Sequence, residues 1–474
     1  MKTNRSNANR NEGSVLLVTM TVLAVAAIAL GSYLLVIQNQ TASVSRSQTW
    51  NSAIAVSEAG VEDALGLINK DAPFISNGAW DWTNSARFDG WTPFANGATS
   101  RSRTVYGTST YNVTVTVTNL GSPPEIASTA SVPLTQAPWV FSSLASPFVA
   151  AGNVQTTTTQ PSMLTRKVKV QTVLVPLFTA AVITKSNFNM NGNSTTVDSF
   201  DSTNVLYSLN GQYSPLLRRA NGDIATDSGV IGDINLGNGN IYGHVYTGAG
   251  TAQSSVAIGS QGAVGDLTWN TSHTGIQSGY WNGNFNVTIP DVPAPTFSPF
   301  PLPAASNGVI TLNGGTYNVT SVPNTPLNIT GPTKLWVQGS FTPSGLTIAS
   351  TNNASLSLFV GTANASGNDS ISIGGNGALN SPGLAENFQI FGLPSLTSIT
   401  FSGNAGFSGT IYAPEAALSG NGGGNNTLDT VGAMIVKSVT LNGHWNFHYD
   451  EALRTRGKSR GWIAKNWTEQ APTN

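Results

Sequence analysis

The N-terminal part of the chain carries a long, uninterrupted apolar run. Ser14 to Ile37 contains no charged residue, and the gap in charge extends from Glu12 to Arg46. As a helix, these 24 residues would span about 36 Å, whereas about 20 apolar residues suffice to cross a bilayer. The pattern therefore predicts a membrane-spanning helix.

Basic residues precede this run, and no comparable cluster follows it. Lys2, Arg5 and Arg10 lie before the apolar segment, and positively charged flanks tend to stay in the cytoplasm. We therefore expect a cytoplasmic N-terminus. A cleaved secretory signal is the alternative, although the apolar region of such a signal usually runs only about 7 to 15 residues.

The helical pattern continues beyond the apolar run. No proline occurs from Gln38 to Asn69, and apolar residues recur there at helical intervals. Glu58, Glu62 and Asp63 occupy the other side, so this part should be amphipathic. The two parts together predict one helix over 14–69, about 84 Å long.

Residues 71–180 change to strand patterns. Apolar and polar residues alternate over 111–118 and again over 166–173. Such alternation indicates strands with one buried face. We expect a small antiparallel sheet packed on the second half of the long helix. The tryptophans of this region could form a carbohydrate platform, but we favour packing for them; they are Trp80, Trp82 and Trp91.

From residue 188 to 449 the chain alternates short apolar runs with Asn/Gly corners. Gly and Asn readily adopt the left-handed backbone conformation that sharp corners require. Strands of about five residues between such corners are typical of a parallel β-helix, with a β-sandwich as the alternative. The corners are 190–193, 281–284, 312–315, 418–421 and 441–444, and the strands include 409–413, 432–436 and 437–441.

The composition favours stacked coils. The 21 basic and 22 acidic residues make up only 9% of the chain, where roughly 25% is usual. Like residues stand above one another in stacked coils, so charged rows would repel while Asn and Thr can hydrogen-bond. A net charge of −1 gives no basis for binding nucleic acid. The absence of Cys excludes disulfides, thiol catalysis and Cys-bound metals.

Residues 11–17 (NEGSVLL), the apolar run after them and residues 55–64 (AVSEAGVEDA) form a recognisable combination. Together they resemble the N-terminus of PilX-type minor pilins of bacterial type IV pili. The resemblance implies that prepilin peptidase removes a basic leader after Gly13 and that Ser14 is the first mature residue. It also implies that the helix packs in a filament core. Major pilins have Glu at the fifth mature position, which here is Val18.

Three further stretches carry a second resemblance: 189–193 with 197–199, 399–424, and 437–453 (KSVTLNGHWNFHYDEAL). They are similar to an uncharacterised Gly/Asn-rich right-handed β-helix domain found behind PilX-type N-termini. That domain is distantly similar to bactofilin-type polymer-forming domains. The resemblance implies a right-handed β-helix with a surface or structural role and no known reaction.

His444, His448, Asp450 and Glu451 are the densest group of potential metal and acid–base residues. On a helix the two His would share a face and could bind Zn. In a strand they would lie about 13 Å apart, too far to share an ion. Neighbouring apolar residues favour a strand, so we expect a cap that closes the last coil. Adjacent strand residues face opposite ways, which disfavours Asp450 and Glu451 as a catalytic pair.

Three weaker motifs have ordinary structural interpretations. Gly457-Lys458-Ser459 matches the end of a P-loop, but Ala452 stands where its first Gly belongs. The basic tail could touch anionic lipid or cell-wall polymer, although we favour a solvated segment that docks back as a last strand through Trp462, Ile463 and Trp467. Four aspartates could suggest calcium but match no EF-hand, so we interpret them as turn residues; they are Asp198, Asp201, Asp223 and Asp233.

The sequence thus predicts a mostly β protein with a long N-terminal helix. Its expected parts are a leader (1–13), a membrane and pilin-like helix (14–70), a β-rich head (71–180), a parallel β-helix (181–451) and a basic tail (452–474). We expect no catalytic residue, cofactor or metal. The expected partners are the membrane, other pilin subunits and surface ligands.

The expected function is that of a non-enzymatic, pilin-like protein of the bacterial cell surface. It would be a single-pass protein of the inner membrane, with its bulk periplasmic or extracellular. It would serve as a minor component or assembly factor of a pilus-like system, or in adhesion. Two alternatives stay open: a membrane-tethered polysaccharide lyase or hydrolase, and a self-polymerising, bactofilin-like scaffold.

Overall fold

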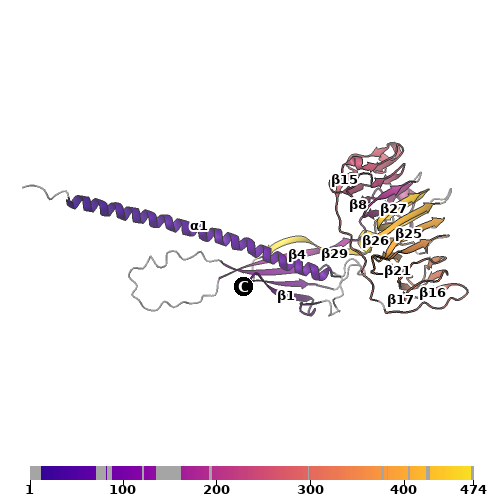
Figure 1. The fold of residues 1–474 in the computed structure, drawn as a ribbon, viewed down its shortest axis with the longest axis horizontal. Helices are drawn as coiled ribbons and strands as arrows, with labels where there is room; N and C mark the ends of the chain where they lie inside the picture. Colours follow the sequence, from indigo (N-terminus) through magenta and orange to yellow (C-terminus); the bar gives the residue numbers. More distant parts are fainter. Residues whose placement is uncertain are drawn as a thin grey trace, which may run out of the picture. The chain divides into compact units, whose positions relative to one another are not determined.

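The computed structural model describes residues 12–70, 82, 88–119, 122–134, 162–191, 195–296, 298–374, 378–381, 383–403, 406–422 and 428–470. They form two compact units, which are described separately. The first contains a long helix and a five-stranded antiparallel sheet, and the second contains a large parallel sheet. Figure 1 labels the helices and strands.

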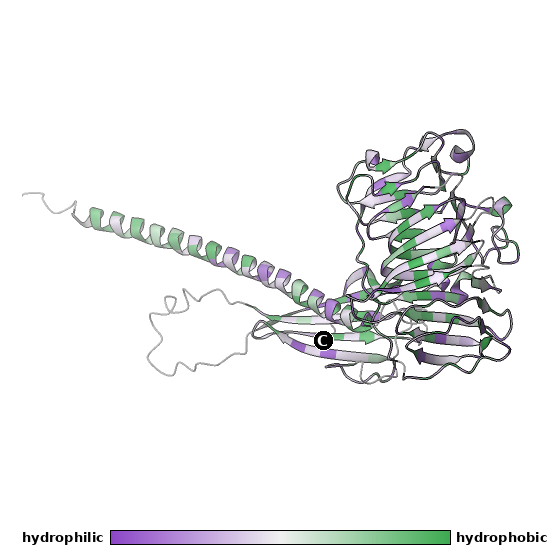
Figure 2. Cartoon of the chain, turned by 45° about the vertical axis from the view of Figure 1, so that its right-hand side comes forward, coloured by the Kyte–Doolittle hydropathy of each residue, from purple (hydrophilic) through white to green (hydrophobic). Residues whose placement is uncertain are grey.

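Helix α1 (Glu12–Ile68) dominates the first unit and is 57 residues long. It runs through both the apolar and the amphipathic segments without a break (Figure 1). Apolar residues cover most of its N-terminal half, and polar residues become frequent in its second half (Figure 2). The prediction of one long helix is confirmed.

The sheet of the first unit has the strand order β1-β2-β3-β4-β29. The alternating stretch 111–118 begins in β2 and runs two residues past its end, the stretch 166–173 lies in β4, and the pairings from β1 to β4 are antiparallel. The last strand comes from the basic tail, which therefore docks back beside β4. The strands are β1 (Ala98–Val105), β2 (Ser109–Thr116), β3 (Glu125–Pro133), β4 (Met163–Pro176) and β29 (Ser459–Gln470).

The second half of α1 packs on this sheet. Ala53, Val61 and Ala64 are completely buried. A Cβ atom on Gly60 would lie 2.3 Å from Oγ of Ser128 on β3, so the close approach of helix and sheet depends on this glycine.

Polar contacts also join α1 to the sheet. Tyr111 on β2 donates a hydrogen bond of 2.8 Å to the Asp63 carboxylate. Arg101 on β1 lies 3.1 Å from the other oxygen of the same carboxylate. Burial and the neighbouring Asp63 raise the pKa of Tyr111. The acidic face of the helix is therefore fixed to two strands.

The second unit is built mainly from short strands. Its described residues also include α2 (Trp269–Ser272), α3 (Leu453–Arg456) and the 3₁₀ turns η3 (Pro215–Leu217), η4 (Gln253–Ser255) and η5 (Ala385–Asn387). The strands are β5 (Val182–Thr184), β6 (Phe188–Met190), β7 (Thr196–Phe200), β8 (Ile224–Thr226), β9 (Ile234–Asn235), β10 (Asn240–Tyr242), β11 (Val245–Gly248), β12 (Val256–Ala257), β13 (Ala263–Gly265), β14 (Gly275–Ile276), β15 (Trp281–Phe285), β16 (Ile310–Leu312), β17 (Gly315–Val319), β18 (Leu327–Ile329), β19 (Pro332–Val337), β20 (Leu346–Ile348), β21 (Ser355–Val360), β22 (Asp369–Ile373), β23 (Ala378–Asn380), β24 (Phe388–Gly392), β25 (Leu396–Gly403), β26 (Phe407–Gly422), β27 (Leu428–Asn442) and β28 (Trp445–Asp450).

These strands pair in parallel along three ladders. The first runs β17-β19-β21-β24-β26-β27-β5-β8-β11-β15. The second runs β16-β18-β20-β23-β26-β27-β28-β7-β10-β13-β14. The third runs β22-β25-β26-β27-β6-β9-β12. Parallel pairing does not fit the alternative of a β-sandwich, which is built from antiparallel sheets.

The order of the strands in space differs from their order in the chain. From β5 the chain passes to β15, continues to β16, and from there reaches β27 and β28, which pair with β5, β6 and β7. Strands β15 and β16 lie at opposite ends of the stack (Figure 1). The last strands therefore close against the first ones in the middle of the stack.

Aliphatic side chains stand in register inside the ladders. Because parallel strands in register place each residue beside its counterpart, such a row buries continuous apolar surface. In the first ladder this buried row is Leu335, Leu358, Ile390, Ile411, Met434, Val182, Ile224 and Val245.

The predicted corners are only partly correct. Gly314 and Gly443 have φ values of +106° and +87°, as a left-handed corner requires. Gly283 and Gly420 instead lie inside β15 and β26, where they make room for neighbours. A Cβ on Gly420 would lie 2.1 Å from the ring of Trp445. The corner at 190–193 lies partly outside the described residues.

The predicted strand lengths also need correction. The stretch 409–413 is part of β26, which has 16 residues, and 432–436 and 437–441 both belong to β27, which has 15. These strands continue from one ladder into the next, because no sharp corner interrupts the pairing of β26 with β27 except a shift between Ala413 and Ala417.

Candidate functional site

The N-terminal half of α1 exposes an apolar surface that none of the residues described in the structure covers. Leu23 and Ile28 are 68% and 70% exposed. Among the described residues, α1 is the one helix long and apolar enough to span a membrane. Contact of this surface with water is unfavourable at roughly 25 cal/mol per Å². The helix therefore fits a single-pass membrane anchor.

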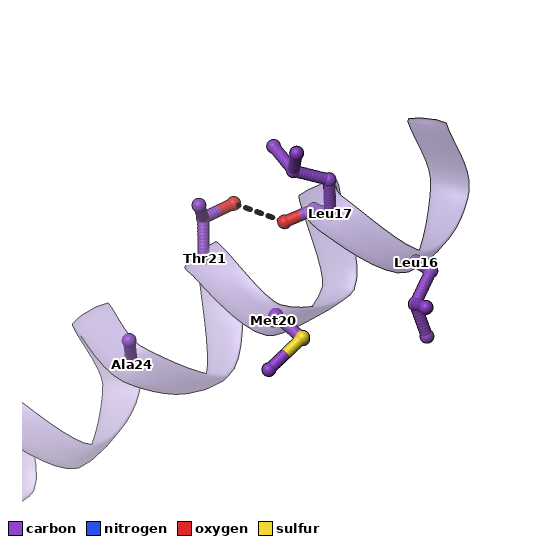
Figure 3. Close-up of a pocket in the computed structure, with 5 residues that line it drawn as sticks. All are labelled: Leu16, Leu17, Met20, Thr21 and Ala24. Carbon is purple, nitrogen blue, oxygen red and sulfur yellow. Dashed lines mark hydrogen bonds between the residues drawn. The ribbon is translucent and has the colours of Figure 1, made fainter. Parts of the chain in front are cut away.

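The few polar side chains in this segment bond within the helix. Thr21 donates to the carbonyl oxygen of Leu17 at 3.0 Å, and Ser32 donates to that of Ile28 at 2.8 Å. Such bonds satisfy hydroxyl groups where lipid offers no partner. Figure 3 shows the first of them beside a shallow apolar depression on the helix, lined by Leu16, Leu17, Met20, Thr21 and Ala24.

The predicted cleavage position lies at the start of this helix. Gly13 and Ser14 belong to the first turn of α1, and Ser14 is exposed. Val18, the fifth residue after the predicted cleavage point, is 57% exposed. Cleavage between Gly13 and Ser14 stays a prediction.

A second candidate site is a buried polar cluster where the last strands meet the first. Asp198 on β7 and His448 on β28 are register partners, and Nδ1 of His448 donates to Asp198 at 2.6 Å. Tyr213 donates to the other oxygen of Asp198 at 2.7 Å and stacks on the imidazole with a centroid separation of 3.5 Å. Nε2 of His448 lies 3.6 Å from Asp429 on β27.

The cluster holds a charged pair in a dry environment. Burial lowers the pKa of His448, but its carboxylate partners Asp198 and Asp429 outweigh this effect and raise the pKa above 6.5. The His448 partner in turn lowers the pKa of Asp429. Burial, followed by the charge of Asp198, raises the pKa of Tyr213. Because Asp198 and His448 are nearly inaccessible, this arrangement locks a seam between strands.

Asp450 and Glu451 hold different backbone segments. Asp450 accepts hydrogen bonds from the backbone N–H groups of Ser202 and Ala452, both at 3.1 Å, and burial raises its pKa. Glu451 accepts from Ser199 at 2.8 Å and lies 3.0 Å from Arg219. The two carboxylates thus have separate hydrogen-bond partners.

The predicted metal alternatives are not supported by the described part of the chain. His448 lies in β28 and His444 precedes that strand, so they do not share a helix face. No group of three or more His, Cys, Asp or Glu in the described residues could hold a metal. The four aspartates have separate partners: Asp198 with His448, Asp201 with Thr203, Asp223 with His244, and Asp233 with Ser228.

Other sequence candidates also have structural positions. Gly457 and Lys458 follow α3, and Ser459 begins strand β29, so this motif does not lead into a helix as a P-loop would. Trp82 and Trp91 are 7% and 8% exposed, which confirms packing, and Trp80 lies outside the described residues. Sequence reasoning missed Tyr213 and Asp429, because neither has a local motif that links it to His448.

Comparisons with known proteins give limited information. Residues 298–456 match the model of a domain of unknown function, DUF7305. No curated protein matches the chain. The chain is similar to the competence-associated pilin ComZ of Thermus thermophilus, with 12% identity over 88% of this chain and 97% of that one, and a TM-score of 0.24. It is also similar to the DUF3494 domain of an ice-binding protein from Shewanella frigidimarina, with 11% identity over 59% of this chain and 100% of that one, and a TM-score of 0.27. TM-scores this low do not establish a shared fold.

Proposed function

We propose that this chain is a pilin-like, membrane-anchored protein of the bacterial cell surface. The observation that carries the proposal is the division of α1 into two halves. The apolar residues of its first half are exposed. Its second half packs on an antiparallel sheet. This is what a subunit needs if it first resides in a bilayer and then contributes its helix to a bundle.

The proposed orientation places the N-terminus in the cytoplasm. It is supported by Lys2, Arg5 and Arg10, which precede the apolar run. The sheet and the second unit then lie on the far side of the inner membrane. In this proposal prepilin peptidase removes the leader after Gly13, and the mature chain begins at Ser14.

The proposed role in a filament is that of a minor component or assembly factor. Position 18 is Val, so the subunit would enter without a buried carboxylate at its fifth mature residue. A charge inside a dry helix bundle is costly unless it is paired. A subunit without it can join a bundle through apolar contacts alone.

We infer that the three parallel ladders wind as a right-handed β-helix that is displayed outside the membrane. Right-handed connections are the rule between parallel strands of one sheet. The pairing of β28 with β7 joins the last strands of the stack to the first ones and fixes the order of the strands. In this proposal the displayed part has a structural and adhesive role and catalyses no reaction.

The leader hypothesis can be tested by changing Gly13 to Ala in a bacterium with a prepilin peptidase. We expect the variant to keep its full mass and to lose exposure at the cell surface, measured by immunoblotting and by surface labelling. A Gly31→Ala variant is the matched control, because a Cβ there meets nothing within 4 Å. Unchanged processing and exposure of the Gly13→Ala variant would show that the prepilin assignment is wrong.

A further inference from the structure

A polar pocket of about 470 Å³ lies wholly within the second unit. Its volume is within the range of about 300–1,000 Å³ that small-molecule sites occupy. Residues from β21, η5, β24, α3 and the segment between α3 and β29 line it. The lining residues are Ser355, Leu356, Ser357, Glu386, Asn387, Gln389, Thr455, Arg456 and Lys458.

Lys458 is the central charged group of this pocket. Its ammonium has no hydrogen-bond or ion-pair partner among the residues that the structure describes. Burial, and then the charge of Lys334 on the neighbouring strand β19, lowers the pKa of Lys458 to about 8. Lys458 is only partly exposed to water, and a cation that is partly desolvated and repelled by another cation is a group that an anion would stabilise.

The other charges favour a monoanion over a dianion. Arg456 lies 3.6 Å from Glu386 across the pocket, so one of the pocket's basic groups already faces a carboxylate. Burial raises the pKa of Glu386, against the opposing effect of Arg456. Because Arg456 and Glu386 offset each other, Lys458 is the one unpaired charge among the described residues that line the pocket, and a single carboxylate matches it, whereas the second negative charge of a phosphate dianion would have no partner.

The walls suit a ligand with several hydroxyl groups. Ser357 and Gln389 are register partners on β21 and β24, and both are partly exposed to the pocket. Ser355 and Asn387 lie beside them. No side-chain hydrogen bond occupies these four groups within the described ranges. Polar walls of this kind can donate to and accept from the hydroxyls of a sugar ring.

We propose that this pocket binds the carboxylate-bearing sugar unit of an acidic saccharide, with the sugar carboxylate on Lys458 and its hydroxyls on the Ser, Asn and Gln side chains. The inference goes beyond the proposed anchoring role, because it concerns a different unit of the chain. It does not depend on cleavage at Gly13.

The test is a titration of the full chain in detergent micelles with D-glucuronate, followed by NMR of the ligand. Controls are D-glucose, acetate and inorganic phosphate. Glucuronate should bind at least ten-fold more tightly than each control, which separates a sugar acid from a neutral sugar, a bare carboxylate and a phosphate. Equal binding of phosphate or acetate would overturn the proposal.

Two further measurements assign the binding to Lys458. Lys458→Met should weaken glucuronate binding at least ten-fold, since a charge-assisted hydrogen bond is lost. The matched control is Lys437→Met, because Lys437 is exposed and lies on β27, outside the pocket. Unchanged affinity in the Lys458→Met protein would overturn the assignment.

The pH dependence gives an independent readout that needs no variant. Because Lys458 has a pKa of about 8, it is charged below that pH and should lose glucuronate as the pH rises above it. Lys334, Glu386 and Arg456 are the other charged groups near the pocket. An affinity that stays constant from pH 6.5 to 9.5 would contradict the proposal even if the Lys458→Met protein does not fold.

Discussion

At the scale of single residues, the buried pair of Asp198 and His448 is the most specific device in the second unit. It joins the first strands of the parallel stack to the last, and Tyr213 covers the imidazole. Removing one partner of such a pair leaves a charge or polar group without compensation. The pair therefore stabilises the observed register of β28 on β7 over registers that are shifted by a residue or more.

This pair predicts a specific dependence of stability on pH. The pKa of His448 is raised in the folded protein, so its stabilising contribution is complete below 6.5 and is lost as the pH rises through the folded value. The melting temperature should therefore fall between pH 6 and 8. His448→Gln should lower stability by about 2 kcal/mol at pH 6 and reduce this slope; the remainder belongs to His244, whose pKa is also raised, by its hydrogen bond to Asp223.

The measurement is thermal unfolding of both proteins across that pH range. His273→Gln is the matched control, because His273 is exposed and stacks on Trp269 away from the seam. If the melting temperature of the His448→Gln protein fell between pH 6 and 8 as steeply as that of the wild type, groups other than His448 would cause the fall. The window stops at pH 8 because Lys458, with a pKa of about 8, changes stability in the opposite direction above it.

At the scale of elements, the contact between α1 and the antiparallel sheet depends on Gly60. A Cβ there would lie 2.3 Å from Ser128, whereas a Cβ on the exposed Gly66 would meet nothing within 4 Å. Gly60→Ala should destabilise the first unit by about 1–3 kcal/mol through overpacking. Gly66→Ala should stabilise α1 by up to about 1 kcal/mol.

Chemical denaturation of the two variants, followed by tryptophan fluorescence, measures this difference. The two substitutions add the same methyl group to the same helix, so intrinsic helix propensity cancels between them. If Gly60→Ala were as stable as Gly66→Ala, the helix would not pack on the sheet as closely as described.

Local sequence patterns predict some of the elements correctly and miss others. Local alternation identifies β2 and β4, and apolar length identifies α1, because these signals depend on the buried face of one segment. The merging of 432–436 and 437–441 into β27 depends on pairing with β26 and could not be read locally. The cluster around His448 likewise joins residues 15 to 250 positions apart, without a motif.

At the scale of the whole molecule, the scarcity of charge has two sources. The exposed half of α1 is almost free of charged residues, as the proposed membrane anchor requires. The parallel ladders repeat hydroxyls, amides and aliphatic side chains in register, where rows of like charge would repel. The ionisable groups that are present in the second unit lie at defined places, such as the seam at His448 and the pocket at Lys458.

The central claim is that α1 anchors a pilin-like chain whose leader is removed. It is tested most directly by extracting the full-length protein from bacterial membranes and determining its N-terminal residue by mass spectrometry. The account predicts a membrane-bound chain that begins at Ser14. A membrane-bound chain that still begins at Met1, or a soluble chain that begins after Ile37, would contradict it.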